Sequence, residues 1–337
     1  MNSHGLAPNH RMTCRTCALY LTENSEHREE RPAMQDIDRR SVLAYLGAVG
    51  AVALAPASGL AQGGALLKKT IPGTGESLPA IGLGSWQTFN VGDDREALDR
   101  CAAVIARFFA LGGTVMDSSP MYGSSQPTIG HALAKLGKQR TVFSVDKVWT
   151  SAEGPAQIEQ SRRYWQVPYF HLLQIHNLLS WEDHLLTLQR MKQERKVRYI
   201  GITTSHGRRH DEFEDVMRKH DLDFIQVTYN ALDREVEQRI LPLAREKGIA
   251  VLINRPFRQG SLIDEVKRHK LPAWAAETGC ANWAQFLLKF VVSHPAVTCA
   301  IPATSRIDHL EENMGAMLGP QPDEAMRRRM AAHVADL

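Results

Sequence analysis

Short apolar runs alternate with longer amphipathic segments from about residue 66 onward. The amphipathic segments have helical spacing of apolar residues and lie near residues 95–111, 125–136, 156–165, 182–193, 209–219, 235–247 and 282–293. The apolar runs predict strands at residues 80–86, 114–118, 141–148, 169–176, 199–204, 224–229, 250–254 and 298–303. Several runs are continuously apolar, as is typical of parallel strands covered on both faces. This alternation predicts an α/β chain folded as a closed (β/α)8 TIM barrel.

Turn residues support these boundaries. Gly137, Gly248 and the pair Gly112-Gly113 stand where predicted helices should stop, because glycine readily adopts the left-handed conformation that ends a helix. Residues 68–77 contain Pro72, Gly73 and Gly75, which predicts a hairpin over the bottom of the barrel.

The first 61 residues have a different pattern. Residues 1–37 are polar without periodicity, and Arg39 and Arg40 then precede an uncharged stretch rich in alanine and glycine at residues 41–61. This resembles a twin-arginine export signal with a cleavage site at residues 59–61. It predicts an N-terminal extension and signal at residues 1–61, a barrel at residues 62–337, and a periplasmic protein without stable membrane insertion after signal removal. An uncleaved membrane anchor is the alternative, which Pro56 and Ser58 disfavour.

Composition narrows the class of protein. The 337 residues are 43% hydrophobic and 23% charged, with a net charge of +3, which is ordinary for a globular protein and gives no electrostatic case for a nucleic-acid partner. The arginines at residues 327–329 are expected on a solvated helix face. Cys14 and Cys17 form a CxxC pair without a second pair nearby, so neither a metal site nor a disulfide framework is predicted.

Four residues stand at or just after the ends of predicted strands: Asp117, Tyr122, Lys147 and His176. Catalytic side chains of β/α barrels come from the carboxyl ends of several strands, so these four are expected to meet. A tyrosine beside a lysine and a carboxylate makes a proton donor with an adjustable pKa. Each residue alone has an ordinary structural explanation, such as a turn cap or a buried histidine. Their common placement favours catalysis.

Several motifs in this order resemble the aldo-keto reductase family over about residues 70–313. They are Gly82-Leu83-Gly84-Ser85-Trp86, the segment Met116-Asp117-Ser118-Ser119-Pro120-Met121-Tyr122-Gly123, the strand of Lys147, Leu173-Gln174-Ile175-His176-Asn177, Ile200-Gly201-Ile202-Thr203, Gln226-Val227-Thr228-Tyr229-Asn230, and Ile301-Pro302 through Glu312-Asn313. A Gly-x-Gly-x-x-Gly motif between a strand and a helix is missing, which disfavours a Rossmann site.

The resemblance implies a catalytic role for the four strand-end residues. Tyr122 would be the general acid, Lys147 would lower its pKa, Asp117 would hold Lys147, and His176 would orient the substrate carbonyl. It also implies bound NADP(H), with NAD(H) as the weaker alternative. The implied nucleotide-binding residues are Gly84, Ser85, Trp86, Thr203, Gln226, Asn254, Arg255, Thr304, Arg306, Glu312 and Asn313.

The chain departs from the family pattern at several of these positions. Thr204 replaces an asparagine that usually holds the carboxamide, and Asn254 stands where an aromatic ring often stacks on the nicotinamide. Ala303 and His309 replace a frequent lysine and arginine near the 2′-phosphate. Selectivity for NADPH therefore depends mostly on Arg306.

The resulting prediction is an NADPH-dependent reductase of small aldehydes or ketones. The alternative is a reductase-like barrel that holds nucleotide and serves a partner with little turnover, as some potassium-channel subunits of the family do. It is motivated by the expected location, where reduced nucleotide is not regenerated. A barrel metal hydrolase is the third reading, although the strand ends supply no clear set of ligands.

Overall fold

The computed structural model describes residues 65–337. The expected export signal and the Cys14 and Cys17 pair lie outside the described residues. Along the described part of the chain, no helix is both long and apolar enough to cross a membrane.

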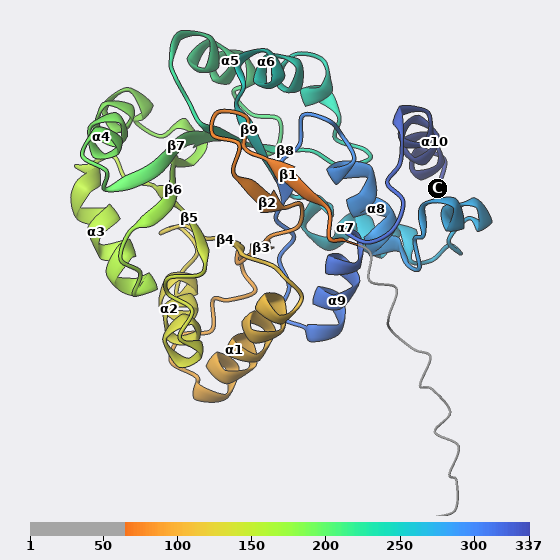
Figure 1. Cartoon of the computed structure of the whole chain (residues 1–337), viewed down its shortest axis with the longest axis horizontal. Coiled ribbons are helices and arrows are strands. Elements are labelled where there is room, and N and C mark those ends of the chain that lie inside the picture. Colours follow the sequence, from red (N-terminus) through yellow and green to blue (C-terminus); the bar gives the residue numbers. More distant parts are fainter. Residues whose placement is uncertain (1–64) are drawn as a thin grey trace, which may run out of the picture. The chain divides into compact units, whose positions relative to one another are not determined.

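Eight parallel strands follow one another around the sheet in the order of the sequence (Figure 1). They are β3 (Leu83–Gly84), β4 (Val115–Asp117), β5 (Phe143–Val148), β6 (Phe170–Ile175), β7 (Val197–Thr203), β8 (Phe224–Thr228), β9 (Ala250–Asn254) and β10 (Cys299–Ala300). Two parallel bridges, Ile81 with Ala300 and Gly84 with Ala303, join the two edges. The sheet therefore closes, which confirms the predicted (β/α)8 barrel.

The helices lie around the outside of the strands (Figure 1). Those expected between strands are α1 (Arg95–Ala110), α2 (Ser125–Leu136), α3 (Gly154–Trp165), α4 (Trp181–Gln193), α5 (His210–Lys219), α6 (Ile240–Lys247) and α8 (Trp283–Val292). Further helices are α7 (Ser261–Val266), α9 (Ile307–Gly315) and α10 (Glu324–Ala335), and four short 3₁₀ turns are η1 (His176–Leu178), η2 (Glu235–Glu237), η3 (Arg258–Gly260) and η4 (Ala273–Thr278).

Local sequence explains where the helices end. Gly137 and Gly248 follow α2 and α6 with φ of 63° and 66°, as predicted for left-handed caps. The single helix predicted at residues 235–247 is wrong, because η2 and α6 are separate. Pro242 lies in the first turn of α6. In a continuous helix its ring would clash with the carbonyl of Gln238.

The core has two apolar parts. One lies between the strands and the outer helices, and the other fills the barrel with side chains such as Val115, Phe143 and Phe224. An antiparallel hairpin, β1 (Lys68–Thr70) and β2 (Ser77–Pro79), lies across one end of the barrel (Figure 1). Its Leu78 packs with the barrel interior, so the hairpin predicted for this region closes the bottom.

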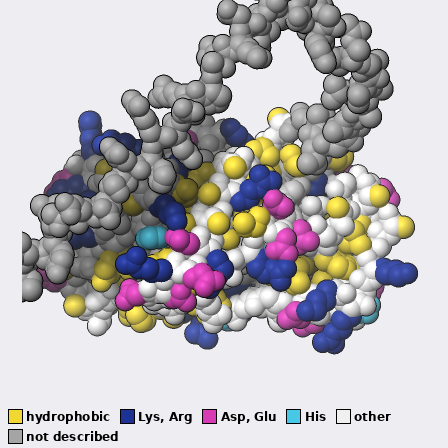
Figure 2. Space-filling model, turned by 90° about the horizontal axis from the view of Figure 1, so that it is seen from below, with side chains coloured by type: hydrophobic (Ala, Val, Ile, Leu, Met, Phe, Trp, Pro, Cys, Tyr) yellow, Lys and Arg dark blue, Asp and Glu magenta, His cyan; other side chains and the backbone are white. Residues whose placement is uncertain are grey.

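The expectation that all three arginines at residues 327–329 face solvent is wrong for Arg327. That side chain is buried and donates to Glu237 Oε1 at 2.9 Å, to Phe290 O at 3.2 Å and to the Tyr229 hydroxyl. It joins α10 to α8 and to the segment after β8. On the face seen in Figure 2, basic and acidic side chains lie interspersed.

Candidate active site

The four strand-end residues meet at the end of the barrel opposite the hairpin. Asp117 is the last residue of β4, Lys147 is the last but one of β5, and His176 directly follows β6. Tyr122 comes from the loop after β4. In parallel strands these positions share one edge, so the chain's pairing of β4, β5 and β6 brings the side chains together. The geometry therefore has the arrangement expected from the sequence.

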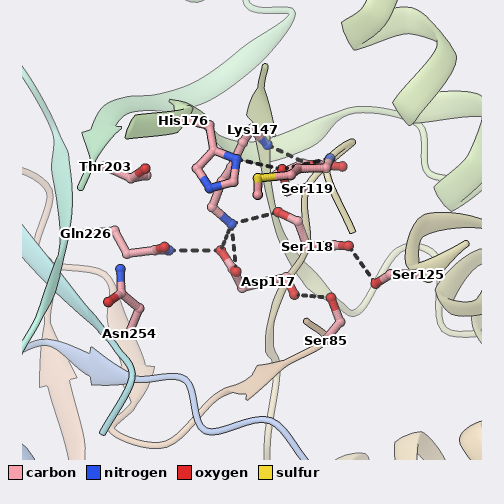
Figure 3. A network of polar contacts seen from close by, with 12 residues as sticks. Ser85, Asp117, Ser118, Ser119, Ser125, Lys147, His176, Thr203, Gln226 and Asn254 are labelled. Carbon is pink, nitrogen blue, oxygen red and sulfur yellow. Dashed lines mark hydrogen bonds and ion pairs between the residues drawn. The ribbon is translucent and has the colours of Figure 1, made fainter. Parts of the chain in front are cut away.

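Lys147 and Asp117 form a buried ion pair at the base of the site. Lys147 Nζ lies 2.7 Å from Asp117 Oδ1, 2.8 Å from Oδ2 and 2.7 Å from Ser118 O (Figure 3). Gln226 Nε2 also donates to Asp117 Oδ2, at 2.9 Å. Burial acts to lower the pKa of Lys147, but the Asp117 carboxylate outweighs it and holds the pKa above its usual value. The lysine is therefore a fixed cation at neutral pH.

The Tyr122 ring lies over this cation. Lys147 Nζ is 5.1 Å from the ring centroid, and the side chain is half-buried at the cavity wall. Burial raises the pKa of Tyr122 above its usual value, and the Lys147 charge offsets only part of that increase. The expected fall in this pKa is therefore not met. The phenol is protonated at neutral pH, and the ammonium beside it is placed to stabilise a phenolate.

His176 meets the edge of the same tyrosine ring. The ring centroids are 5.7 Å apart and the planes are nearly perpendicular, at 87°. Burial, with a smaller contribution from the Lys147 charge, lowers the pKa of His176 to about 3. The imidazole is therefore neutral at physiological pH. It lines the cavity, where it can form a hydrogen bond with a bound oxygen atom.

A cavity of about 640 Å³ extends from these residues across the barrel mouth to α9. Of the residues implied for nucleotide binding, all but one line it: Gly84, Ser85, Trp86, Thr203, Gln226, Asn254, Arg255, Thr304, Glu312 and Asn313. The volume is in the range typical of ligand sites. At the mouth, Trp86, Met121 and Asn177 line the cavity.

Gly84 and Ser85, at the end of β3, form one wall of this cavity. A side chain at Gly84 would place its Cβ 2.7 Å from Ile301 O, so only glycine fits between the two strands there. Ser85 next to it is buried, and its hydroxyl donates to Asp117 O at 2.8 Å. The residues present thus form a fixed wall beside the Asp117 carboxylate, and a nicotinamide nucleotide fits against it.

Three of the residues implied for nucleotide binding, namely Thr203, Gln226 and Asn254, bond to other protein groups. Thr203 Oγ1 accepts from the Asn177 backbone N–H at 3.0 Å, and Gln226 donates to Asp117. Asn254 accepts from Thr228 Oγ1 at 2.7 Å and donates to Thr204 O at 3.0 Å. The Asn254 amide is therefore locked in the place where the family pattern has an aromatic ring.

Arg306 is the implied residue that does not line the cavity. It is exposed and pairs with Asp308, with Nε 3.0 Å from Oδ1. Arg255 does line the cavity, has a left-handed backbone with φ of 52°, and contacts the His206 ring. His309 and Lys267 also lie along this end of the cavity. The 2′-phosphate contact predicted for Arg306 would need the pair with Asp308 to open.

Sequence reasoning missed two buried groups beside the site. Ser119 Oγ lies 2.8 Å from His176 Nδ1, and Asp146 lies directly before Lys147 on β5. Asp146 accepts from Gln126 Nε2 at 2.7 Å, and burial raises its pKa to about 7. A charged residue within a buried strand was the available signal for Asp146. Across residues 65–337, His, Cys, Asp and Glu side chains do not form groups of three suited to a metal ion.

Comparison with known proteins adds to this geometry. The sequence model of the Aldo/keto reductase family matches residues 80–333. The chain belongs to the aldo/keto reductase family. It is an enzyme of that family, whose described relatives include NAD(P)H-dependent reductases.

Two curated relatives of this aldo-keto reductase come from Escherichia coli. Methylglyoxal reductase YeaE is 27% identical over 250 residues, which cover 72% of this chain and 86% of that protein. An NADH-specific methylglyoxal reductase is 26% identical over 245 residues, which cover 62% of this chain and 73% of that protein.

Solved structures share the fold of this aldo-keto reductase. An aldo/keto reductase from Klebsiella pneumoniae in complex with NADP and acetate has a TM-score of 0.67 at 23% identity, covering 79% of this chain and 95% of that one. The holo form of an aldo-keto reductase from Bacillus halodurans has a TM-score of 0.65 at 20% identity, covering 80% and 96%.

Proposed function

We propose that the protein reduces small aldehydes or ketones to alcohols, using NADPH as the hydride source and Tyr122 as the proton donor. One observation carries the proposal: the buried Lys147 ammonium lies between the Asp117 carboxylate, at 2.7 Å, and the Tyr122 ring, at 5.1 Å from its centroid. The arrangement puts a proton donor at the wall of the cavity of about 640 Å³, with a fixed cation directly behind it.

The chain's own residues supply the proton and the orientation. A reduced nicotinamide nucleotide, when bound, supplies the hydride that leaves negative charge on the carbonyl oxygen. Tyr122 gives its proton to that oxygen, and Lys147 stabilises the phenolate left behind. Asp117 keeps the ammonium charged and in place. His176, neutral because of its burial, forms a hydrogen bond with the same oxygen and aligns the carbonyl.

Nucleotide binding is proposed for the cavity wall formed by β3 and the residues after β10. Gly84, Ser85 and Trp86 would border the nicotinamide, and Arg255 would approach the pyrophosphate. Thr203 and Gln226 would form hydrogen bonds with the carboxamide in place of their present bonds to the Asn177 backbone and to Asp117. Glu312 and Asn313 would meet the adenine.

We favour NADP(H) over NAD(H), because Arg306 can turn to a 2′-phosphate at small cost. Its pair with Asp308 is exposed, and such pairs contribute at most about 1 kcal/mol. The NADP-bound Klebsiella structure supports this choice, while the NADH-specific Escherichia coli relative favours the other nucleotide.

The proposed substrates are small, and methylglyoxal is the first to test. Support comes from the names of both Escherichia coli relatives and from the open mouth beside Met121, whose side chain is 45% exposed. The assay follows loss of NADPH with methylglyoxal and other carbonyls, for the wild type and Tyr122→Phe. We expect multiple turnovers by the wild type and a rate lower by roughly 10²–10⁴ in the variant.

Equal rates for the two proteins would refute the mechanism. Tight nucleotide binding without multiple turnover of any carbonyl would favour the nucleotide-holding alternative instead.

We also propose a periplasmic location after export by the twin-arginine route. The support is the position of Arg39 and Arg40 before the uncharged stretch at residues 41–61. Replacing both arginines by lysine should leave the protein in the cytoplasm, and N-terminal sequencing of the mature protein should begin near residue 62. Unchanged fractionation of the double-lysine variant would exclude this route.

A further inference from the structure

Ser119 is a buried hydroxyl between two polar groups in the loop after β4. Its Oγ lies 2.8 Å from His176 Nδ1, and the backbone N–H of Met121 donates to it at 3.2 Å (Figure 3). Ser119 is fully buried and His176 is 6% exposed. The roles implied by the catalytic residues leave this serine without a function.

The donors and acceptors around Ser119 determine the direction of its hydrogen bond to the histidine. A serine hydroxyl has one hydrogen to donate and two lone pairs to accept with. Met121 N–H uses one lone pair, and within the described residues His176 Nδ1 is the acceptor in reach of the hydrogen. A hydrogen on Nδ1 would leave the buried hydroxyl hydrogen without an acceptor, which typically costs about 1–3 kcal/mol.

The direction of this bond also decides what His176 offers to a substrate. A neutral imidazole carries one hydrogen, on either Nδ1 or Nε2. If Nδ1 accepts from Ser119, the hydrogen is on Nε2. Nε2–H then donates a hydrogen bond to a carbonyl oxygen. In the other tautomer Nε2 carries a lone pair, which would repel that oxygen.

We propose that Ser119 is a positioning residue that fixes His176 as the Nε2–H tautomer and so makes it a hydrogen-bond donor to the substrate oxygen. The inference rests on the proposed carbonyl reduction. It places Met121 N–H, Ser119 O–H and His176 Nε2–H in one chain, in which each bond polarises the next.

The turn that contains Ser119 also connects these hydrogen bonds to Tyr122, the proposed proton donor. The Tyr122 backbone N–H donates to Ser119 O at 3.0 Å, and the Tyr122 ring packs edge-on against His176. The serine therefore aligns the histidine from its side chain and anchors the tyrosine loop from its backbone. Only the side-chain contribution should be lost when the hydroxyl is removed.

The test compares wild type with Ser119→Ala in the full chain. A matched control exists at the opposite end of the barrel, where the buried Ser144 Oγ lies 3.1 Å from His171 Nδ1. Ser144→Ala removes a part-buried serine–histidine contact whose residues do not line the cavity. The ring ¹⁵N shifts of His176 report the tautomer without any substrate, with the signal assigned by its loss in His176→Asn. Steady-state kinetics with methylglyoxal give kcat and KM separately.

We expect Nε2–H in the wild type and in Ser144→Ala, and a mixture of both tautomers in Ser119→Ala. In Ser119→Ala, kcat should fall about tenfold with little change in KM. This is less than the ~10²–10⁴-fold rate contribution of a general acid, because Ser119 only orients the histidine. If Ser119→Ala does not fold, Ser119→Cys serves instead, because it keeps the shape and has only a weak donor.

Two results would overturn the inference: a wild-type His176 with its hydrogen on Nδ1, or a serine variant in which either the His176 tautomer or kcat is unchanged. Turnover by a wild type carrying Nδ1–H would remove the role of Ser119 and leave the proposed function intact. Absence of carbonyl turnover would refute the proposed function, while the ring shifts would still decide the tautomer.

Discussion

Replacing Asp117 by asparagine tests the buried ion pair on which the proposed chemistry depends. The substitution keeps the shape of the side chain and removes the charge that faces Lys147. Asp117 is 2% exposed and Lys147 is fully buried, so no solvent replaces the lost partner. Breaking one side of a buried pair typically costs about 3–5 kcal/mol. For a barrel of this size, that lowers the melting temperature by roughly 10 °C.

The same change should affect catalysis. Lys147 either stays charged without a counterion or loses its proton, and in both cases Tyr122 no longer faces a fixed and correctly placed cation. We expect kcat/KM for methylglyoxal to fall by about 10²–10⁴. Thermal melting followed by circular dichroism and steady-state NADPH oxidation measure the two effects on one preparation.

The double variant Asp117→Asn with Lys147→Met separates stability from chemistry. Removing both charges eliminates the uncompensated ion, so the melting temperature should recover most of its loss, while activity should not return. As a control, Asp99→Asn breaks the exposed pair with Lys135, at 2.6 Å, and should change stability by less than about 1 kcal/mol. The proposed role of the ion pair is refuted if Asp117→Asn melts like the wild type and keeps its kcat/KM, or if the double variant is less stable than the single one.

Three further perturbations follow from the same contacts. Because burial lowers the folded-state pKa of His176 to about 3 from an ordinary 6.5, the stability that the neutral imidazole contributes is complete above pH 6.5 and is lost as the pH falls toward 3. The loss between pH 6.5 and pH 5 is about 2 kcal/mol, and urea titrations at these two pH values should show a correspondingly smaller loss in His176→Asn. Asp308→Ala should raise the preference for NADPH over NADH up to about fivefold by freeing Arg306, and Arg306→Ala should lower it about tenfold; equal ratios of kcat/KM in all three proteins would exclude this contact. Gly84→Ala puts a methyl group 2.7 Å from Ile301 O, so the nucleotide Kd from fluorescence titration should rise about tenfold, and an unchanged Kd would contradict the tight fit.

The order of strands and the meeting of the four candidate catalytic residues could be predicted from the sequence. In a parallel barrel the carboxyl ends of all strands lie at one edge, so placing Asp117, Lys147 and His176 at strand ends is enough to bring them together. Helix ends were also readable where a glycine takes the left-handed conformation, as at Gly137.

The partners of individual polar side chains, near or far along the chain, could not be predicted in this way. Arg327 looked like part of a solvated run, yet it crosses to Glu237 on a segment that is 90 residues earlier in the chain. Arg306 looked free for a phosphate, and a carboxylate two residues away holds it. The role of a polar side chain depends on which neighbour the fold brings within about 3 Å, and apolar periodicity carries no information on that.

The strands of the barrel differ in length, so the pairing between neighbouring strands is more extensive on one side than on the other. β5, β6 and β7 have six or seven residues each, whereas β3 and β10 have two each, and two bridges close the gap between them. The amides of this seam should exchange with solvent sooner than those of the central strands. Gly84 and Ser85 on one side and Thr304 on the other line the cavity where the nucleotide is proposed to lie. A dinucleotide bound at the proposed place would contact both sides of this seam, so nucleotide binding should slow amide exchange there.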